Sequence, residues 1–215
     1  MGVTSGAFAV YICDILIGMF MSKAQATRSD ILRRAMELIY KQGFQSTSID
    51  DILATTQVTK GAFYYHFKNK EEMGIALIDE AMHTEIWPDI QNSLSSSSNF
   101  RDNIYKMMDK LLFKHPFMTV EHGCPAVNLI QEMAPLNDAF RLALKKSLNK
   151  WERAIEAEII RGQETGQLAR SHDAKQIALH IITLYHGVRN MGKLLGKPYY
   201  VSFLSEFRQY LDSLK

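Results

Sequence analysis

The chain has 215 residues, of which 47% are hydrophobic and 22% charged, with 12 Gly and 5 Pro. This composition is typical of one globular unit or two small ones and excludes a disordered or fibrous chain. The formal charge of +2 excludes a general nucleic-acid coat protein, so any basic surface must be local. Cys13 and Cys124 form no CxxC pair, which argues against a disulfide framework or a zinc finger and favours a reducing, cytoplasmic compartment.

The first segment is apolar but lacks the features of a targeting signal. No Lys or Arg precedes the run from Phe8 to Phe20, Asp14 interrupts it, and a second Met follows at Met21. The run is also too short to cross a bilayer. We therefore expect residues 1–22 to be a leader or an added extension outside the fold, and we expect no membrane partner.

Helix signals begin at Thr27. Three polar residues each precede an acid by three positions, an arrangement that satisfies the free amides at a helix start: Thr27 with Asp30, Ser48 with Asp51, and Asn69 with Glu72. Apolar spacing predicts a first helix over 27–42 stopped by Gly43, a short second helix from Ile49, a tight corner at Gln57 and Val58, and a third helix over 60–67. The order is that of a helix-turn-helix unit.

The rest of the chain also has helical spacing. The pattern predicts helices over 71–87, ending before Pro88, and over 100–114, 126–133 and 137–166, then one from Ile177 ended by Gly192 and Gly196, and a last one striped by Phe203, Phe207 and Tyr210. The serine-rich stretch 92–99 predicts a loop.

Basic residues concentrate near the N-terminal end. Residues 23–70 carry eight Lys or Arg against four acids, whereas residues 71–215 carry 17 bases against 18 acids. A polyanion is therefore attracted to the first segment, and the second segment must have another task.

The stretch 43–73, GFQSTSIDDILATTQVTKGAFYYHFKNKEEM, resembles the DNA-binding signature of the TetR family of bacterial repressors. It has the Gly-Phe, the Thr-Ser helix start, the turn, the Tyr-x-His-Phe recognition helix and the Lys-Glu of the next helix. The resemblance implies an all-α fold, with an N-terminal three-helix DNA-binding domain at 23–70 and a C-terminal helical effector-binding and dimerisation domain at 71–215. Gln57 stands where the family usually has Gly, and Thr56 where it usually has Ala; a non-Gly residue at this turn is expected to carry about 1 kcal/mol of backbone strain.

The predicted recognition helix begins with small or polar side chains that a DNA major groove accepts. We expect Lys60 to donate to guanine, Gly61 to permit close approach and Ala62 to touch a thymine methyl group. The resemblance implies phosphate contacts from Tyr64 and His66. Lys70 and Ser48 lie at the N-terminal ends of two predicted helices, where the helix dipole favours an anion. The predicted DNA-binding residues are Ser48, Thr59, Lys60, Gly61, Ala62, Tyr64, Tyr65, His66 and Lys70. For Tyr64, Tyr65 and His66 the alternative is burial in a core. We expect Phe63 and Phe67 to point inward against Ile31, Leu38 and Ile52 and so to fix the angle between the helices.

The centre of the chain combines aromatic and Met side chains with a few polar ones, a composition typical of a small-molecule cavity. The predicted ligand-binding residues are Trp87, Tyr105, Met108, Phe117, His122, Cys124, Asn128, Trp151 and Tyr185. The segment HGCPAVNLIQEM resembles the Gly-Cys helix start of a TetR subgroup that includes repressors responding to electrophiles, and a thiol at a helix start favours thiolate chemistry. The alternatives are an inert buried cysteine and a metal site formed by His115, His122 and Cys124.

No P-loop, GxSxG, HExxH or dinucleotide motif is present, so the sequence indicates no enzyme, cofactor or metal. The patterns together predict a cytoplasmic repressor that leaves a palindromic double-stranded operator when a small, electrophilic effector binds. We expect a homodimer through the last two helices, because the stripe of Phe203, Phe207 and Tyr210 needs a cover; packing within one chain is the alternative. A helical partner-binding protein without DNA affinity, or an enzyme using the central cavity, are the other functions left open.

Overall fold

The computed structural model describes residues 22–215, and the expectation for the preceding segment lies outside them. The described chain folds into α2 (Lys23–Gln42), α3 (Ile49–Ala54), α4 (Lys60–His66), α5 (Lys70–Ala76), the π-helical turn η1 (Leu77–Ala81), α6 (Met82–Leu94), α7 (Phe100–Asp109), the π-helical turn η2 (Lys110–Lys114), α8 (Pro125–Met133), α9 (Asp138–Glu164), α10 (Ala174–Leu195) and α11 (Lys197–Ser213). Residues 22–215 contain no strand, which confirms the all-α prediction.

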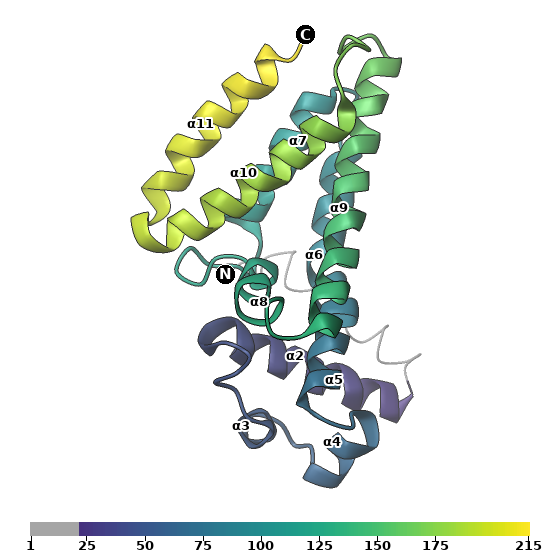
Figure 1. Ribbon diagram of the computed structural model, residues 1–215, viewed down its shortest axis with the longest axis vertical. Coiled ribbons are helices and arrows are strands. Elements are labelled where there is room, and N and C mark those ends of the chain that lie inside the picture. The colour runs from purple at the N-terminus through teal and green to yellow at the C-terminus, as the bar shows by residue number, and fades with distance from the viewer. Residues whose placement is uncertain (1–21) are drawn as a thin grey trace, which may run out of the picture.

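The helices form an elongated molecule with two unlike ends (Figure 1). Helices α2 to α5 make up one end, which we call the N-terminal unit, and α10 and α11 lie toward the other. Between them α6 and α9 pack side by side, and α8 packs on α9. Helix α10 contacts both α9 and α11, and α11 also contacts α7.

Two clusters of buried side chains stabilise these ends. The first cluster contains Ile31 of α2, Ile52 of α3 and Phe63 of α4, so the expected packing of the recognition helix on its neighbours is confirmed. Leu129 of α8 and Phe140 of α9 complete the same cluster. The N-terminal unit is therefore joined to the rest of the chain through a shared apolar core.

Helix α2 begins earlier than the capping pattern predicted. The Ser22 side chain accepts a hydrogen bond from the Gln25 amide, and the Gln25 side chain accepts one from the Ser22 amide. The Thr27 hydroxyl instead donates to the Lys23 carbonyl, 2.9 Å away inside the helix. A Thr with an acid three residues later thus occurs within a helix as well as at its start. The predicted starts at Ser48 and Asn69 are confirmed by their capping hydrogen bonds.

Helix α6 continues through Pro88, so the predicted end before this residue is wrong. A proline removes one backbone donor and disturbs the carbonyls of the preceding turn. The ring Nε2 of His115 lies 3.2 Å from the Glu85 carbonyl oxygen in the turn before Pro88. Buried Met82 and Ile90 on either side of Pro88 keep the helix packed.

Gly192 also lies inside a helix, whereas the sequence predicted a helix end there. A Cβ at this position would stand 2.1 Å from the Tyr200 ring. The glycine therefore permits close approach of α11 to α10, and the helix ends at Gly196 with φ of 75°.

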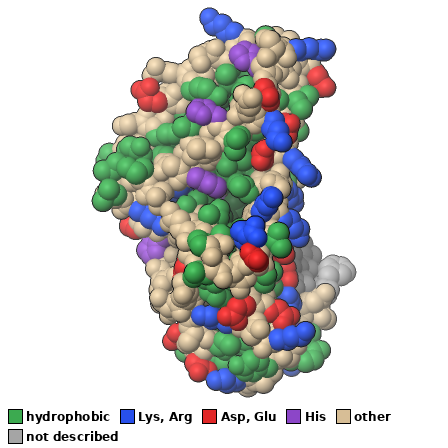
Figure 2. Space-filling model, in the orientation of Figure 1, with side chains coloured by type: hydrophobic (Ala, Val, Ile, Leu, Met, Phe, Trp, Pro, Cys, Tyr) green, Lys and Arg blue, Asp and Glu red, His purple; other side chains and the backbone are tan. Residues whose placement is uncertain are grey.

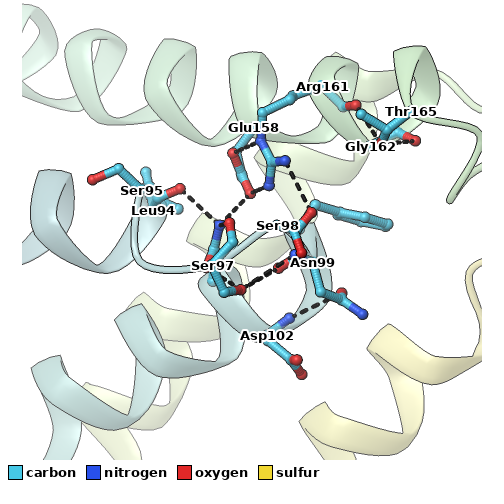
Figure 3. Close-up of polar contacts among 12 residues, drawn as sticks. Leu94, Ser95, Ser97, Ser98, Asn99, Asp102, Glu158, Arg161, Gly162 and Thr165 are labelled. Atoms are coloured by element: carbon cyan, nitrogen blue, oxygen red, sulfur yellow. Dashed lines mark hydrogen bonds and ion pairs between the residues drawn. The ribbon is translucent and has the colours of Figure 1, made fainter.

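The serine-rich loop is held against α9 by buried polar groups (Figure 3). The buried Asn103 amide donates to the carbonyls of Leu94 and Ser97 and to Glu158 Oε1, at 3.0, 2.9 and 2.8 Å. Arg161 pairs with Glu158 and donates to the Ser98 carbonyl. The buried Glu158 carboxylate is thereby supplied with hydrogen bonds, as burial of a charge requires.

The apolar stripe of the last helix packs within the chain. Phe207 is buried, and Phe203 and Tyr210 are half-buried against the same core, so the expectation that this stripe needs a second chain is wrong. Other large apolar side chains of α10 and α11 face outward: Leu179, Met191, Leu194, Leu195 and Val201. Hydrophobic side chains gather where the two helices meet (Figure 2). Within residues 22–215, no helix combines the length and apolarity needed to cross a bilayer.

Candidate nucleic-acid interface and central cavity

The start of α4 is open to solvent. Thr59 caps the helix by accepting from the Ala62 amide at 3.2 Å. A Cβ added at Gly61 would meet no atom within 4 Å. Tyr64 and Tyr65 are 49% and 78% exposed, so burial in a core is wrong for both. This surface is small at its start and carries phenol groups further along.

Lys60 is engaged by an acid of the preceding helix. Its Nζ lies 2.9 Å from Asp50 Oδ1, with both side chains exposed. The hydrogen bond that Lys60 donates to the Asp50 carboxylate, followed by the charge of that carboxylate, raises the pKa of Lys60. Exposed ion pairs of this kind contribute little stability, so a guanine can replace Asp50 as the partner of Lys60.

Lys70 contacts the backbone of the N-terminal unit. Its Nζ donates to the carbonyls of Phe44 and Thr47, each at 3.0 Å, and lies 4.6 Å from the Phe44 ring centroid. The ammonium therefore stabilises the turn between α2 and α3. Ser48, on the same turn, is engaged in its capping box with Asp51. Phosphate contacts from Lys70 and Ser48 stay predictions.

The turn before α4 is free of the strain expected at Gln57. Among residues 22–215, only glycines have a positive φ. The Thr56 hydroxyl accepts from the Val58 amide and donates to the Leu53 carbonyl, each at 3.1 Å. A side-chain hydrogen bond at Thr56 thus shapes the turn that a glycine forms in other sequences.

Arg28 holds the end of α4, a role that no local signal in the sequence indicated. It donates to the His66 carbonyl at 3.0 Å, forms an ion pair with Glu80 and lies 4.3 Å from the Phe67 ring centroid. Burial, followed by the Arg28 charge, lowers the pKa of His66. The His66 ring is therefore neutral at pH 7 and retains one N–H for a phosphate oxygen.

A cavity of about 310 Å³ lies in the centre of the molecule. Its walls come from η1, α6, η2, α8, α9 and α10, so both π-helical turns contribute to it. Figure 2 shows a hollow with hydrophobic side chains inside and basic and His side chains near its rim. Of the predicted ligand-binding residues, the cavity brings together Trp87, Cys124, Trp151 and Tyr185.

The other five predicted ligand-binding residues lie outside the lining of this cavity. Met108 is buried in the core, and Tyr105 lies under Arg208. Phe117 and His122 contact the Tyr40 ring at centroid distances of 4.7 and 5.4 Å, and Asn128 bonds the His122 carbonyl. Helical spacing identified buried or half-buried faces but not which faces converge on one space. The sequence also missed lining residues His83, Lys146 and Lys150.

Helix α8 connects this cavity to the N-terminal unit. Cys124, Ala126 and Ile130 line the cavity. At one end of the helix, the Tyr40 hydroxyl of α2 donates to the Gly123 carbonyl at 2.8 Å. At the other end, the Glu132 carboxylate accepts from the amides of Phe44 and Gln45 at 2.9 and 2.7 Å. A displacement of α8 therefore acts directly on the turn that precedes α3.

Arg189 is buried behind the cavity wall, among phenol groups. Its Nε and Nη1 lie 3.3 and 3.2 Å from the hydroxyls of Tyr185 and Tyr200. No carboxylate of residues 22–215 forms an ion pair with it, and its Nη2 has no hydrogen-bond partner there. One sign of this buried cation is present in the sequence: Arg189 directly follows Val188, at the end of an apolar stripe that includes Tyr185.

The metal alternative does not fit the geometry. His115 Nδ1 accepts from the amides of Phe117 and Met118 at 3.2 and 3.3 Å, and Nε2 faces the Glu85 carbonyl. Both ring nitrogens are thus engaged, and burial lowers the pKa of the ring. In the part of the chain that the structure describes, no three His, Cys, Asp or Glu side chains are grouped as metal ligands.

Comparisons with known proteins agree over most of the chain. The family model for bacterial regulatory proteins of the tetR family matches residues 31–77, and the model for the tetracyclin repressor-like C-terminal domain matches residues 106–206. The transcriptional regulator AcuR of Cereibacter sphaeroides is 32% identical over 180 residues, covering 81% of this chain and 80% of that protein. The HTH-type transcriptional repressor NemR of Escherichia coli K12 is 26% identical, covering 78% and 84%.

A solved structure supports the fold. The TetR-family transcriptional regulator from Cytophaga hutchinsonii superposes with a TM-score of 0.81, covering 91% of this chain and 98% of that one. At 21% sequence identity, this similarity concerns the arrangement of helices alone.

Proposed function

Because the chain belongs to the TetR family of bacterial regulators, we propose that it is a cytoplasmic repressor whose dimer leaves a palindromic operator when a small molecule fills the central cavity. The observation that carries the proposal is the open start of α4, fixed on a rigid apolar core. A helix presented in this way enters the major groove without changing shape.

The roles at the DNA follow from position on α4. Thr59, Lys60, Gly61 and Ala62 face the bases, with Lys60 donating to guanine after leaving Asp50. Tyr64, Tyr65 and His66 lie further along and donate to phosphate oxygens. Ser48 and Lys70 approach the phosphates from the neighbouring turn, where Lys70 already stabilises the backbone.

The dimer forms through α10 and α11. The outward apolar side chains of these helices, among them Leu179, Leu194 and Val201, supply the apolar area that a two-fold contact covers. Two copies of α4 about 34 Å apart then read half-sites one helical turn apart.

The switch acts through α8. A molecule in the cavity contacts Cys124, Ala126 or Ile130, and α8 holds the N-terminal unit through Tyr40 and Glu132. A hundredfold loss of operator affinity requires the effector to favour the non-binding state by about 2.7 kcal/mol. A small displacement of α8 in each subunit is enough, because the two copies of α4 must keep a fixed spacing to contact both half-sites.

Release by an electrophile is a second, covalent route, separate from reversible filling of the cavity, and it acts at Cys124. This free cysteine lies at the start of α8, lines the cavity and is 4% exposed. Small electrophiles reach it through the cavity. The rate of alkylation by iodoacetamide at neutral pH tests this: a rate no faster than that of free cysteine contradicts a sensor role.

Operator binding tests the proposal as a whole. Fluorescence anisotropy with DNA from upstream of the protein's own gene is expected to show sequence-specific binding that weakens steeply with salt. Lys60→Ala is expected to relax base preference, whereas Lys70→Ala weakens binding to all sequences alike. Absence of binding to every fragment at low ionic strength contradicts the proposed function, and identical behaviour of the two variants contradicts the assigned roles.

A further inference from the structure

The inner part of the cavity is apolar and electrically neutral. Trp151 contacts Tyr185 edge to face at 4.8 Å, and Ile86, Ile90 and Leu111 line the same space. Burial raises the pKa of Tyr185 and lowers the pKa of His186. Both groups are therefore uncharged at pH 7, and this part of the cavity fits an apolar, aromatic body.

The rim of the cavity is basic. Lys146 and Lys150 lie one turn apart on α9 and line both the cavity and an adjoining groove, which also includes Arg153 and Trp87. Asp79 is the acid at this rim, and it forms an ion pair with Lys146 at 3.0 Å. The rim thus carries an excess of positive charge beside an uncharged interior.

Lys150 lies at this rim beside two aromatic rings. Its Nζ lies 4.0 Å from the Trp87 ring centroid and contacts the His83 ring, which stacks on Trp87. Burial, followed by the Lys150 charge, lowers the pKa of His83, so this partner is neutral. No carboxylate of residues 22–215 forms an ion pair with Lys150.

We propose that the effector is an amphipathic anion, with an apolar or aromatic body in the cavity and a carboxylate or similar group at the rim on Lys150 and Lys146. The inference rests on the proposed function and names the chemical class of its ligand. An anion beside Lys150 is close to the low-dielectric interior, where a charge-assisted hydrogen bond is stronger than in water. Trp87 and His83 provide flat surfaces for an aromatic ring next to that anion.

Two probes of the same shape and different charge test the proposal in the full chain. The anion 3-phenylpropanoate and the neutral 3-phenylpropanamide share an aromatic body, and neither absorbs where tryptophan is excited selectively. Both tryptophans of the chain line the cavity, so quenching of intrinsic fluorescence reports occupancy. The anion is expected to bind at least about tenfold more tightly at low ionic strength, and this preference should shrink with added salt.

Charge variants locate the effect. Lys150→Met is expected to reduce the preference to less than about threefold while leaving the affinity for the amide unchanged, because Met keeps the apolar stem. Lys150→Arg retains the charge and should retain the preference, which guards against a misfolded Met variant. Lys175→Met, on the exposed start of α10, is the matched control and should behave as the wild type.

Equal affinity for the two probes, binding of neither probe, or an unchanged preference in Lys150→Met overturns the inference. Operator binding by the probe-free protein is measured in the same samples. If the wild type binds the operator but shows no preference for the anion, only the proposed ligand class is contradicted. If the wild type does not bind the operator, the proposed function itself is contradicted.

Discussion

The two functional regions of this chain differ in where their side chains come from. The predicted DNA contacts belong mainly to one short helix, α4, and point outward. The cavity is lined from η1, α6, η2, α8, α9 and α10, whose lining side chains point inward. A surface of consecutive residues keeps its chemistry whatever packs behind it, whereas a cavity exists only when several helices are correctly spaced. Substitutions in the two regions should therefore change operator affinity and folding stability separately.

The largest effect is expected at Gly61. Gly61→Leu fits the fold, because a Cβ there meets no atom within 4 Å, but its side chain occupies the space that the DNA groove needs. Operator affinity should fall about a hundredfold or more, equivalent to about 2.7 kcal/mol. Folding stability should stay equal or rise by about 0.5–1 kcal/mol, because glycine weakens a helix.

Anisotropy titrations and thermal unfolding measure these two quantities. Gly61→Ala, with a single added methyl group, is the graded control and should lose less affinity. Wild-type operator affinity in Gly61→Leu would place the start of α4 outside the groove.

At Asn103 the opposite result is expected, namely a loss of folding stability with operator affinity retained. Asn103→Leu removes the amide that donates to Glu158 and to the ends of the serine-rich loop. The free energy of unfolding should fall by about 2 kcal/mol, because a buried carboxylate loses a hydrogen bond. Urea unfolding measures this loss. Ser97→Ala, which removes a hydroxyl donor to Asn103 and the acceptor of the Asn99 amide on the serine-rich loop, should cost less. Operator affinity should stay within about twofold, and its loss in a folded variant would argue against the separation.

Glu132 connects the two regions, so a change there should affect both mildly. Glu132→Gln replaces a carboxylate that accepts from two backbone amides, at a cost of about 1 kcal/mol. Hydrogen exchange at the amides of Phe44 and Gln45 should become faster, and operator affinity should fall severalfold. Glu164→Gln, at the end of α9, is the control for loss of charge. Unchanged exchange at both amides would remove α8 from the proposed switch.

The smallest effect concerns pH. Burial lowers the pKa of His115 below its ordinary value of 6.5, so the unfolded chain binds a proton more readily than the folded one. The stability contributed by the neutral ring is complete above pH 6.5 and is lost as the pH falls below it. Between pH 7.5 and 5.5 the free energy of unfolding should drop by about 1 kcal/mol.

Urea unfolding at several pH values measures this drop, and His115→Asn should show a shallower one. His186 is half-buried and also has a pKa lowered by burial, so His186→Asn is the comparison variant. Equal pH slopes in wild type and His115→Asn would show that His115 binds protons equally in the folded and unfolded states.

Local signals predicted the N-terminal unit well. The capping pairs at Ser48 and Asn69, the stop at Gly43 and the inward faces of Phe63 and Phe67 all depend on residues within a few positions of one another. The exceptions have local causes too. Thr27 donates within a helix, and Thr56 replaces a glycine turn by its own hydrogen bonds.

Distant contacts explain what the sequence missed. Arg28, Tyr40 and Glu132 act through partners more than 35 positions away in the chain. In the sequence, Lys150 cannot be distinguished from a solvated surface charge. The fold places Trp87 and His83 beside it. Among the predicted ligand-binding residues, those outside the cavity lie on α7, in the segment between η2 and α8, or on another face of α8.

The sequence by itself determined the helical class, most helix boundaries, the basic N-terminal unit and the outward chemistry of α4, because apolar spacing, caps and charge act over a few residues. Only the tertiary structure decided which side chains enclose the cavity, which rings lie beside Lys150 at its rim and how α8 holds the α2–α3 turn. Spacing along a helix defines its buried face, but the neighbour that covers this face depends on how helices cross in three dimensions.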